Sequence, residues 1–387
     1  MAPRLRTQVI AFTAARLVFN TAFRMVTPLL PAFRDGLGVS LKQLAVPLTW
    51  RSLAGALGPF LASIADTRGR KVGMLVGLFL FSSGISIVIF WPTFLGFTIA
   101  LVVSTLGKFV FDPAMQAYLG DRVPFERRGF VLAMAELGWS GASLLGVPLM
   151  AMLIAKAGWL APFPLLALLG VAAMLTIYKL MPHDKPDASE YSNLFRNFGI
   201  VFSSASAWAG LSVVFLLSLS NEIVNLIVGV WLEDAFALQI ASLGAVAIVI
   251  GLAELSGEGL VSGLVDRLGK RRSITIGLVG NSLAALALPV LSSSLPGAII
   301  GLFIFYISFE FTFVSALPLM TELLPKTRAT YMALIFASAS IGRAAADAIG
   351  IQIFVLGFAV SAGAAALINA GALLALRGVR VAADETS

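Results

Sequence analysis

The sequence predicts an all-α polytopic membrane protein with twelve transmembrane helices in two pseudo-symmetric bundles of six. Three observations lead to this fold class. Of the 387 residues, 59% are hydrophobic and only 12% are charged, and the mean hydropathy is +0.95. The apolar residues form about a dozen runs of spanning length, since one span needs about 20 of them. A short cationic turn also appears twice, 200 positions apart.

Six apolar runs make up the first half. They follow the basic residues Arg4 and Arg6 and are separated by short turns. The first run reaches Leu30 without a small-residue cleavage site, so we interpret it as a retained helix and not as a secretory signal. The predicted helices are 8–33, 44–65, 72–90, 93–119, 129–155 and 160–181.

A polar stretch, Pro182–Asn197, separates this half from the second, and it is interpreted as a linker with room for a short surface helix. The second half again contains six apolar runs. They predict helices at 200–232, 239–264, 273–292, 296–323, 329–355 and 357–377. The expected domains are an N-terminal bundle (1–181), a cytoplasmic linker (182–198) and a C-terminal bundle with a short cytoplasmic tail (199–387).

Lysine and arginine are strongly biased to one side of the predicted membrane. Nineteen of them lie in the termini, the linker and the connections after even-numbered helices, whereas the opposite connections hold only Arg34, Lys42 and Lys156. Because basic residues stay in the cytoplasm, we expect both termini there. The net charge of +7 then reports topology and attraction to anionic headgroups, so nucleic-acid binding is not expected.

The two halves share polar positions at a nearly constant offset of 200 to 201 residues. Three separate matches at this spacing indicate an internal duplication. The matches are Asp66–Lys71 with Asp266–Arg271, Asn20 with Asn221, and Asp121–Pro124 with Glu322–Pro325.

The sequence lacks the residues that several kinds of catalytic and metal-binding site require. The chain has no cysteine and one histidine, His183 in the linker, which excludes disulfides, thiol catalysis and zinc sites built from Cys or His clusters. The sequence also lacks a phosphate-binding Gly loop ending in Lys-Ser/Thr and a Ser–His arrangement. We therefore expect no enzymatic activity, no cofactor, no metal and no transport driven directly by ATP hydrolysis.

With these features the chain resembles the major facilitator superfamily, closest in style to bacterial drug and metabolite efflux permeases. The family carries Gly-x-Leu-Ala-Asp-Arg-x-Gly-Arg-Lys between helices two and three; here residues 62–71 read ASIADTRGRK and residues 262–271 read SGLVDRLGKR. Ala62 and Ser262 replace the leading Gly, and Thr67 replaces the Arg. The resemblance covers essentially the whole chain. It implies alternating access in a bacterial plasma (inner) membrane by a monomer that binds a small-molecule substrate, H⁺ and the lipid bilayer.

The cationic turns suit a breakable contact at the membrane edge. A Gly permits close approach of two helix ends, and an acid at this depth can face a helix N-terminus or an Arg. In the family such a turn is thought to latch the two bundles together in one of the alternating states. Carried to this sequence, the conformational latch comprises Asp66, Arg70, Lys71, Asp266, Arg267 and Arg271. The alternative is a plain turn that only sets topology.

Ionisable residues inside the predicted spans are the main functional signal, because each costs roughly 2.5–3.5 kcal/mol at mid-membrane on insertion scales. They are Arg16, Arg24, Arg51, Lys108, Asp112, Glu136, Glu222, Glu254, Glu258, Glu310, Arg343 and Asp347. In the family, helices 1, 4, 7 and 10 line the central cavity. We expect a cavity with positive charge mainly from the first half and negative charge mainly from the second. Its substrate and coupling residues would be Arg16, Arg24, Lys108, Asp112, Glu136, Glu222 and Glu310.

Simpler explanations exist for several of these charges. Lys108 and Asp112 lie four positions apart and can neutralise each other along one helix face. Glu222 and Glu310 have no residue of opposite charge near them in the sequence. A carboxyl group that changes protonation as water access alternates is a proton carrier. The alternative for both is a neutral, hydrogen-bonded acid that only holds helices together.

Helix five departs from the family's antiporter pattern, Gly-x-x-x-Gly-Pro-x-x-Gly-Gly. This chain instead has Gly138, Gly141, Gly146 and Pro148, and these residues suit close helix packing or a bend. Tryptophans fall mostly near predicted span ends, where they are interpreted as interface anchors. Trp50 and Trp139 are also candidate substrate contacts.

Three functions fit these features. The first is secondary active export of a small organic solute in exchange for protons, the activity of an antiporter. The second is translocation of a lipid or lysolipid, which would tolerate loss of the acids, and import of a nutrient is a further alternative within the same fold. The third is a membrane sensor or scaffold that transports nothing. The sequence favours export and does not identify the substrate.

Overall fold

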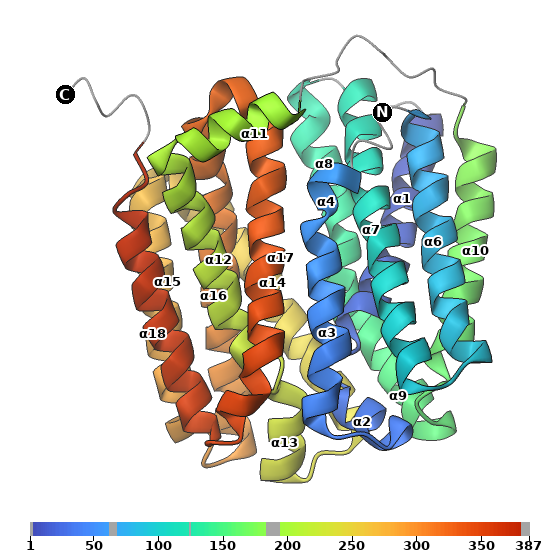
Figure 1. Cartoon of the computed structure of the whole chain (residues 1–387), viewed down its shortest axis with the longest axis vertical. Helices are drawn as coiled ribbons and strands as arrows, with labels where there is room; N and C mark the ends of the chain where they lie inside the picture. The colour runs from blue at the N-terminus through green and yellow to red at the C-terminus, as the bar shows by residue number, and fades with distance from the viewer. Residues whose placement is uncertain (1–2, 62–67, 124, 183–193, 381–387) are drawn as a thin grey trace. The chain divides into compact units, whose positions relative to one another are not determined.

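The computed structural model describes residues 3–61, 68–123, 125–182 and 194–380, and almost all of them are helical. Contacts along the chain divide it into two units (Figure 1). The first unit comprises Met1–Glu190 with Ala237–Ile248, and the second comprises Tyr191–Phe236 with Val249–Ser387. This helical architecture confirms the predicted all-α fold class.

In the first unit, α6 packs most extensively against α7 and against α10, while α1 packs against α8 and α10. A π-helical segment, Ala142–Gly146, joins α8 to α9. The helices of this unit are α1 (Pro3–Arg24), α2 (Leu30–Leu37), α3 (Leu41–Ala56), α4 (Gly58–Leu61), α6 (Arg70–Phe90), α7 (Phe94–Arg122), α8 (Phe125–Gly141), α9 (Val147–Ala157) and α10 (Pro162–Leu180).

In the second unit, α15 packs against α16 as α6 packs against α7, and α12 packs against α17 and α18. The short α11 lies across the ends of α12 and α17 (Figure 1) and contacts both. The helices of this unit are α11 (Leu194–Ser203), α12 (Ala205–Asn225), α13 (Val228–Phe236), α14 (Ile240–Leu268), α15 (Lys270–Leu291), α16 (Leu295–Leu323), α17 (Arg328–Phe354) and α18 (Phe358–Leu376). The first residues of α14, up to Ile248, belong to the first unit.

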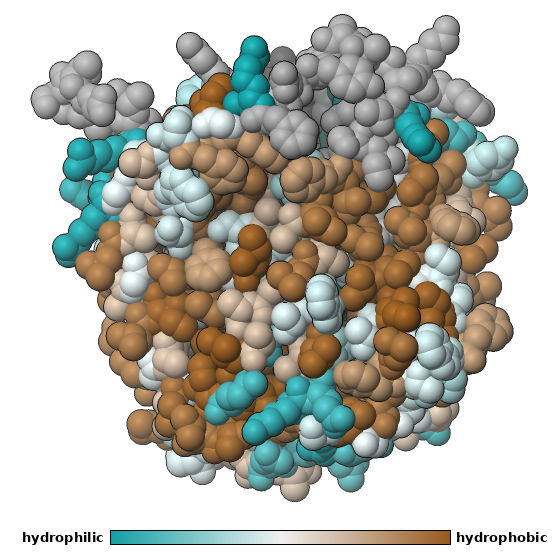
Figure 2. Space-filling model, viewed as in Figure 1, coloured by the Kyte–Doolittle hydropathy of each residue, from teal (hydrophilic) through white to brown (hydrophobic). Residues whose placement is uncertain are grey.

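Within the described residues, ten helices are long and apolar enough to cross a membrane. Helices α1 and α3 occupy the places of the first two predicted spans, although α1 carries four arginines and α3 is only 16 residues long. Hydrophobic residues predominate along the helices on the face seen in Figure 2, and hydrophilic residues gather toward the helix ends. This distribution is the one expected where lipid surrounds the helices.

Some predicted helices are interrupted at proline. The expected helix 8–33 is instead divided into α1 and α2, and Pro28 lies in the break, where its ring and missing N–H oppose a continuous helix. The expected helix 129–155 contains the π-helical segment directly before Pro148. One extra residue in that turn accommodates the missing hydrogen bond.

Two glycines bring the backbones of α6 and α7 into contact. A Cβ on Gly107 would lie 2.5 Å from the carbonyl oxygen of Gly77, and a Cβ on Gly77 would lie 2.7 Å from that of Gly107. Both distances are shorter than a real Cβ contact. Small residues at such crossings let membrane helices gain van der Waals contact along their length.

We expect Gly107→Ala to lower the free energy of unfolding by about 1–3 kcal/mol, because the methyl group must displace the α6 backbone. Gly120→Ala is the matched control on the same helix, since no atom lies within 4 Å of its Cβ position. The control should unfold at the wild-type temperature or slightly above it. Thermal unfolding of the purified protein checks this, and equal melting temperatures for the two variants would contradict the close crossing.

Candidate functional site

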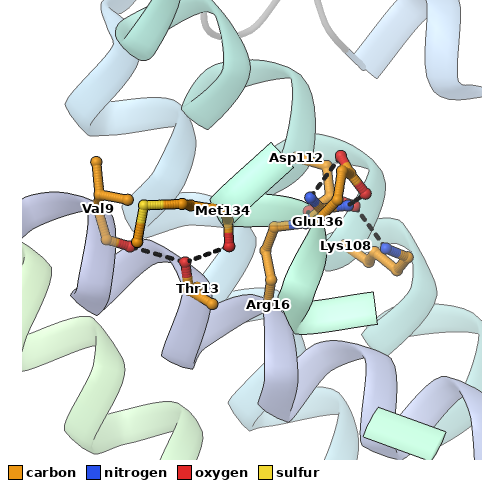
Figure 3. A network of polar contacts seen from close by, with 7 residues as sticks. All are labelled: Val9, Thr13, Arg16, Lys108, Asp112, Met134 and Glu136. Carbon is orange, nitrogen blue, oxygen red and sulfur yellow. Dashed lines mark hydrogen bonds and ion pairs between the residues drawn. The ribbon is translucent and has the colours of Figure 1, made fainter. Parts of the chain in front are cut away.

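Four charged side chains form a network inside the first unit (Figure 3). Arg16 on α1 contacts Asp112 on α7, with 3.3 Å between Nε and Oδ1. Arg16 also contacts Glu136 on α8, at 2.7 Å and 2.9 Å through its two terminal nitrogens. Lys108 donates to the second Asp112 oxygen, Oδ2, at 2.5 Å. Two cations and two carboxylates thus make a neutral chain, Lys108–Asp112–Arg16–Glu136, which we name the charged network.

Burial differs along the charged network. Arg16 is 4% exposed and Lys108 is 7% exposed. The side chain of Asp112 is 17% exposed, but that of Glu136 is 45% exposed. Because a buried charge inside a membrane persists only with a partner, Asp112 is the group that compensates both buried cations. Glu136 is the most exposed member of the charged network.

The close packing of α8 on α1 positions the charged network. A Cβ on Gly138 would lie 2.8 Å from the Arg16 Cβ and 2.9 Å from the carbonyl oxygen of Thr13. The Thr13 hydroxyl also donates to the Met134 carbonyl at 3.1 Å (Figure 3). Since Glu136 lies between Met134 and Gly138 on α8, these contacts bring its carboxylate within reach of Arg16.

Trp139 connects a further cation to this site. The Arg24 Cζ lies 4.4 Å from the centroid of the Trp139 ring, and the Lys108 Nζ lies 5.6 Å from it. Both distances fall in the range of cation–π attraction. Contact with two cations sets Trp139 apart from an ordinary interface anchor, and it makes the indole part of the candidate site.

In the second unit, a chain of polar contacts includes Glu222. Tyr306 on α16 donates its hydroxyl to the Asn225 Oδ1 at 2.8 Å, and the Asn225 Nδ2 donates to the Glu222 Oε2 at 3.1 Å. Glu222 is 4% exposed. Glu310 is 8% exposed and lies at the crossing of α16 with α14, where a Cβ on Gly257 would meet its Cβ at 2.8 Å.

Four of the predicted site residues therefore contact one another in the charged network. Arg24 joins them through its contact with Trp139. Glu222 and Glu310 lie in the other unit on separate helices, α12 and α16. The sequence reasoning missed Asn225 and Tyr306. Asn225 had a detectable signal, because it lies three positions after Glu222 and such pairs face each other on a helix. The transport roles of all these residues stay predictions.

The last basic residue of each cationic turn binds carbonyl groups in its own unit. Lys71 is 6% exposed, and its Nζ donates to the Met181 carbonyl after α10 at 2.7 Å. Arg271 donates to the carbonyls of Val379 and Arg377 after α18, at 3.2 Å and 3.3 Å. Carbonyls at a helix C-terminus lack partners within the helix. Lys71 and Arg271 therefore cap the last helix of each unit.

The other predicted latch residues divide into three groups. The Arg70 Nε lies 3.5 Å from the Asp121 Oδ2, and at the equivalent place Lys270 pairs with Glu322. Asp266 and Arg267 are exposed. Asp66 lies outside the described residues. Arg70, Lys71 and Arg271 thus make contacts inside their own units, and a latch that includes them stays a prediction.

Comparison with known proteins gives consistent results. The family model of the Major Facilitator Superfamily matches residues 12–347. The chain is 26% identical over 285 residues to the uncharacterized MFS-type transporter YwfA of Bacillus subtilis (strain 168), covering 72% of this chain and 69% of that protein. It is 24% identical over 280 residues to the multi-drug resistance efflux pump PmrA homolog of Lactococcus lactis subsp. lactis (strain IL1403), covering 67% and 66%.

Among solved structures, a D-xylose–proton symporter is similar with a TM-score of 0.79. The two sequences are 14% identical, and the match covers 97% of this chain and 98% of the symporter. At this identity the similarity shows the fold alone.

Within the charged network, we expect Asp112→Asn to destabilise the protein more than Glu136→Gln. Asp112 compensates two buried cations, so its loss should lower the free energy of unfolding by about 3–5 kcal/mol. Glu136 has a half-exposed side chain and contacts Arg16 only, so its loss should cost about 1 kcal/mol or less. Thermal unfolding of both variants in one detergent measures the difference. Equal losses, or the reverse order, would show that Asp112 is not the central carboxylate.

The two helix-capping bases should also differ in their effect on stability. Lys71→Gln leaves the buried Met181 carbonyl without a charged donor and should cost about 1–3 kcal/mol. Arg271 is exposed, so water can replace it, and Arg271→Gln should change stability by about 0.5 kcal/mol or less. The same unfolding assay compares them. A larger loss of stability for the Arg271 variant would contradict the claim that the buried cap contributes more than the exposed one.

Proposed function

The chain belongs to the major facilitator superfamily, and on this premise we propose that it exports a small organic solute by alternating access in exchange for protons. Members of this family are membrane transporters and not enzymes, and the apolar helices make this chain an integral membrane protein. The proposal places it in a bacterial plasma membrane with both termini in the cytoplasm. The efflux pump of Lactococcus lactis among its relatives supports export as the direction.

The observation that carries the proposal is the charged network in the first unit. Four charges held inside membrane helices are expensive to build, and a protein that is only a scaffold can pack its helices with apolar side chains instead. Protonation of Glu136 would leave the network with one positive charge in excess and would release Arg16 from one of its two partners. Because α8 and α1 are in close contact at this place, a proton bound here changes how strongly the two helices hold each other.

Glu222 and Glu310 are the proposed proton carriers of the second unit. Both are buried, at 4% and 8% exposure, so proton exchange requires that water reach them in one of the alternating states. Asn225 holds the Glu222 carboxyl in a fixed position, and the hydroxyl of Tyr306 sets the orientation of that amide. A carboxyl group in a fixed position and with changing access to water suits a coupling role.

Proton coupling can be measured in proteoliposomes that contain a pH-sensitive dye. We expect addition of a transported solute, tested first with ethidium and a neutral sugar, to drive proton movement in vesicles with the wild-type protein. Glu222→Gln and Glu310→Gln should reduce this movement to the level of empty vesicles, since neither amide can exchange a proton. Glu322→Gln, at an exposed turn, is the control and should retain it. Unchanged coupling in both span variants would overturn the assignment.

A further inference from the structure

A small pocket lies inside the first unit, where α1, α3, α6 and α7 meet. Its polar lining comes from Arg51, Ser104, Thr105 and Lys108, and Phe23 is among the apolar residues around them. The free volume is about 10 Å³, which is close to the space that one water-sized group needs. Lys108 belongs to the charged network, so the pocket and the network share a wall.

Arg51 is a buried cation with few partners. It is 2% exposed; its Nη1 donates to the Phe23 carbonyl at 2.9 Å, and its Cζ lies 4.5 Å from the centroid of the Phe23 ring. The Nε is buried and has no hydrogen-bond partner among the described residues. The ion pairs found in the described part of the chain do not include Arg51. A guanidinium offers five N–H donors. The Phe23 carbonyl accepts from one nitrogen, so most of the hydrogen-bonding capacity of Arg51 is unused by the residues that the structure describes.

The net charge around the pocket also indicates that Arg51 lacks a negative partner within the described ranges. Arg16 and Lys108 are balanced by Asp112 and Glu136 in the charged network. Arg51 adds a third cation beside them, so these five side chains carry one positive charge more than they carry negative charges. An excess charge inside a membrane protein is costly unless an ion or a ligand balances it. The pocket between Arg51 and Lys108 is where a negative group can approach both cations.

We propose that this pocket binds one oxygen of a carboxylate on the transported solute, so that the substrates are organic acids. The inference rests on the proposed transport function. The volume suits a single oxygen, such as one end of a carboxylate. Ser104 and Thr105 add hydroxyl groups, although the Ser104 hydroxyl already donates to the Leu101 carbonyl at 3.2 Å. Because the space holds only that oxygen, the hydrocarbon part of the acid would lie outside the pocket.

Arg51 also has a local structural role that the test must separate from binding. Phe23 lies in the last turn of α1, where carbonyl groups have no partner within the helix. By donating to this carbonyl, Arg51 caps α1 at its break before α2. A purely structural role predicts that changing Arg51 lowers the melting temperature but leaves ligand-induced stabilisation unchanged.

The probes are acetate, lactate and benzoate, each compared with its neutral amide at constant pH and ionic strength. We expect at least one of the acids to raise the melting temperature of the purified full-length protein, since a ligand that binds only the folded state stabilises it, and we expect its amide to have no effect. Arg51→Gln should weaken the binding of that acid by about tenfold or more, the scale for losing a charge-assisted hydrogen bond. Arg51→Lys keeps the charge and should retain part of the effect. Arg380→Gln, an exposed arginine outside the spans, should bind as the wild type does.

Several outcomes would overturn the inference. These are an absence of stabilisation by all three acids, equal stabilisation by acids and amides, and wild-type acid binding in Arg51→Gln. An Arg51-dependent shift produced by chloride alone would assign the pocket to an inorganic ion and would also overturn it. If Arg51→Gln does not fold, Arg51→Lys and the acid–amide comparison in the wild type decide.

The same purified protein separates this inference from the proposed function. Proton flux driven by neutral solutes, without acid binding, would leave proton-coupled export standing and end the carboxylate assignment. Acid binding that depends on Arg51, without proton flux for any solute, would support the carboxylate assignment and end the proposal of proton-coupled export.

Discussion

A charge placed among membrane helices must find its partner in the protein, because neither lipid nor bulk water will supply one. Arg16 shows how this constraint shapes the first unit. Its guanidinium is almost fully buried and holds carboxylates from two different helices, Asp112 on α7 and Glu136 on α8. The absence of a side chain at Gly138 lets α8 approach α1 closely enough for the second contact. The ion pairs therefore hold three helices, α1, α7 and α8, together. The packing of these helices in turn keeps each buried charge next to its partner.

Much of this fold follows from the sequence, since apolar runs, basic turns and the duplicated motif depend only on local patterns. The Lys108–Asp112 pair could also be foreseen because its members lie four positions apart on one helix. The Arg16–Glu136 contact joins residues 120 positions apart, and no local pattern reports which helix faces meet. Arg51 was visible as a charge in a span, but its pocket appears only once four helices come together. Asp66, the acid of the first turn, lies outside the described residues.

The duplication is retained at the edges of the two units and in the buried pair Asn20 and Asn221, but it is lost among the buried charged groups. Lys71 and Arg271 cap the last helix of their units, and Arg70 and Lys270 each pair with an acid near the end of the next helix. These equivalent contacts maintain the shared scaffold. The buried polar groups differ, with a neutral network of four charges in one unit and an acid held by an amide and a tyrosine in the other. These differences allow the two units to carry different functions on one shared scaffold.

The most direct test of this account is a double-mutant cycle on Arg16 and Glu136, measured by the free energy of unfolding. Arg16→Gln alone leaves two carboxylates facing one lysine, whereas the double variant with Glu136→Gln leaves the balanced Lys108–Asp112 pair. The account predicts that the double variant is more stable than Arg16→Gln alone and that the coupling between the sites is about 0.5–3 kcal/mol. Losses that simply add would show that the two charges act independently, and the charged network would not be a functional unit.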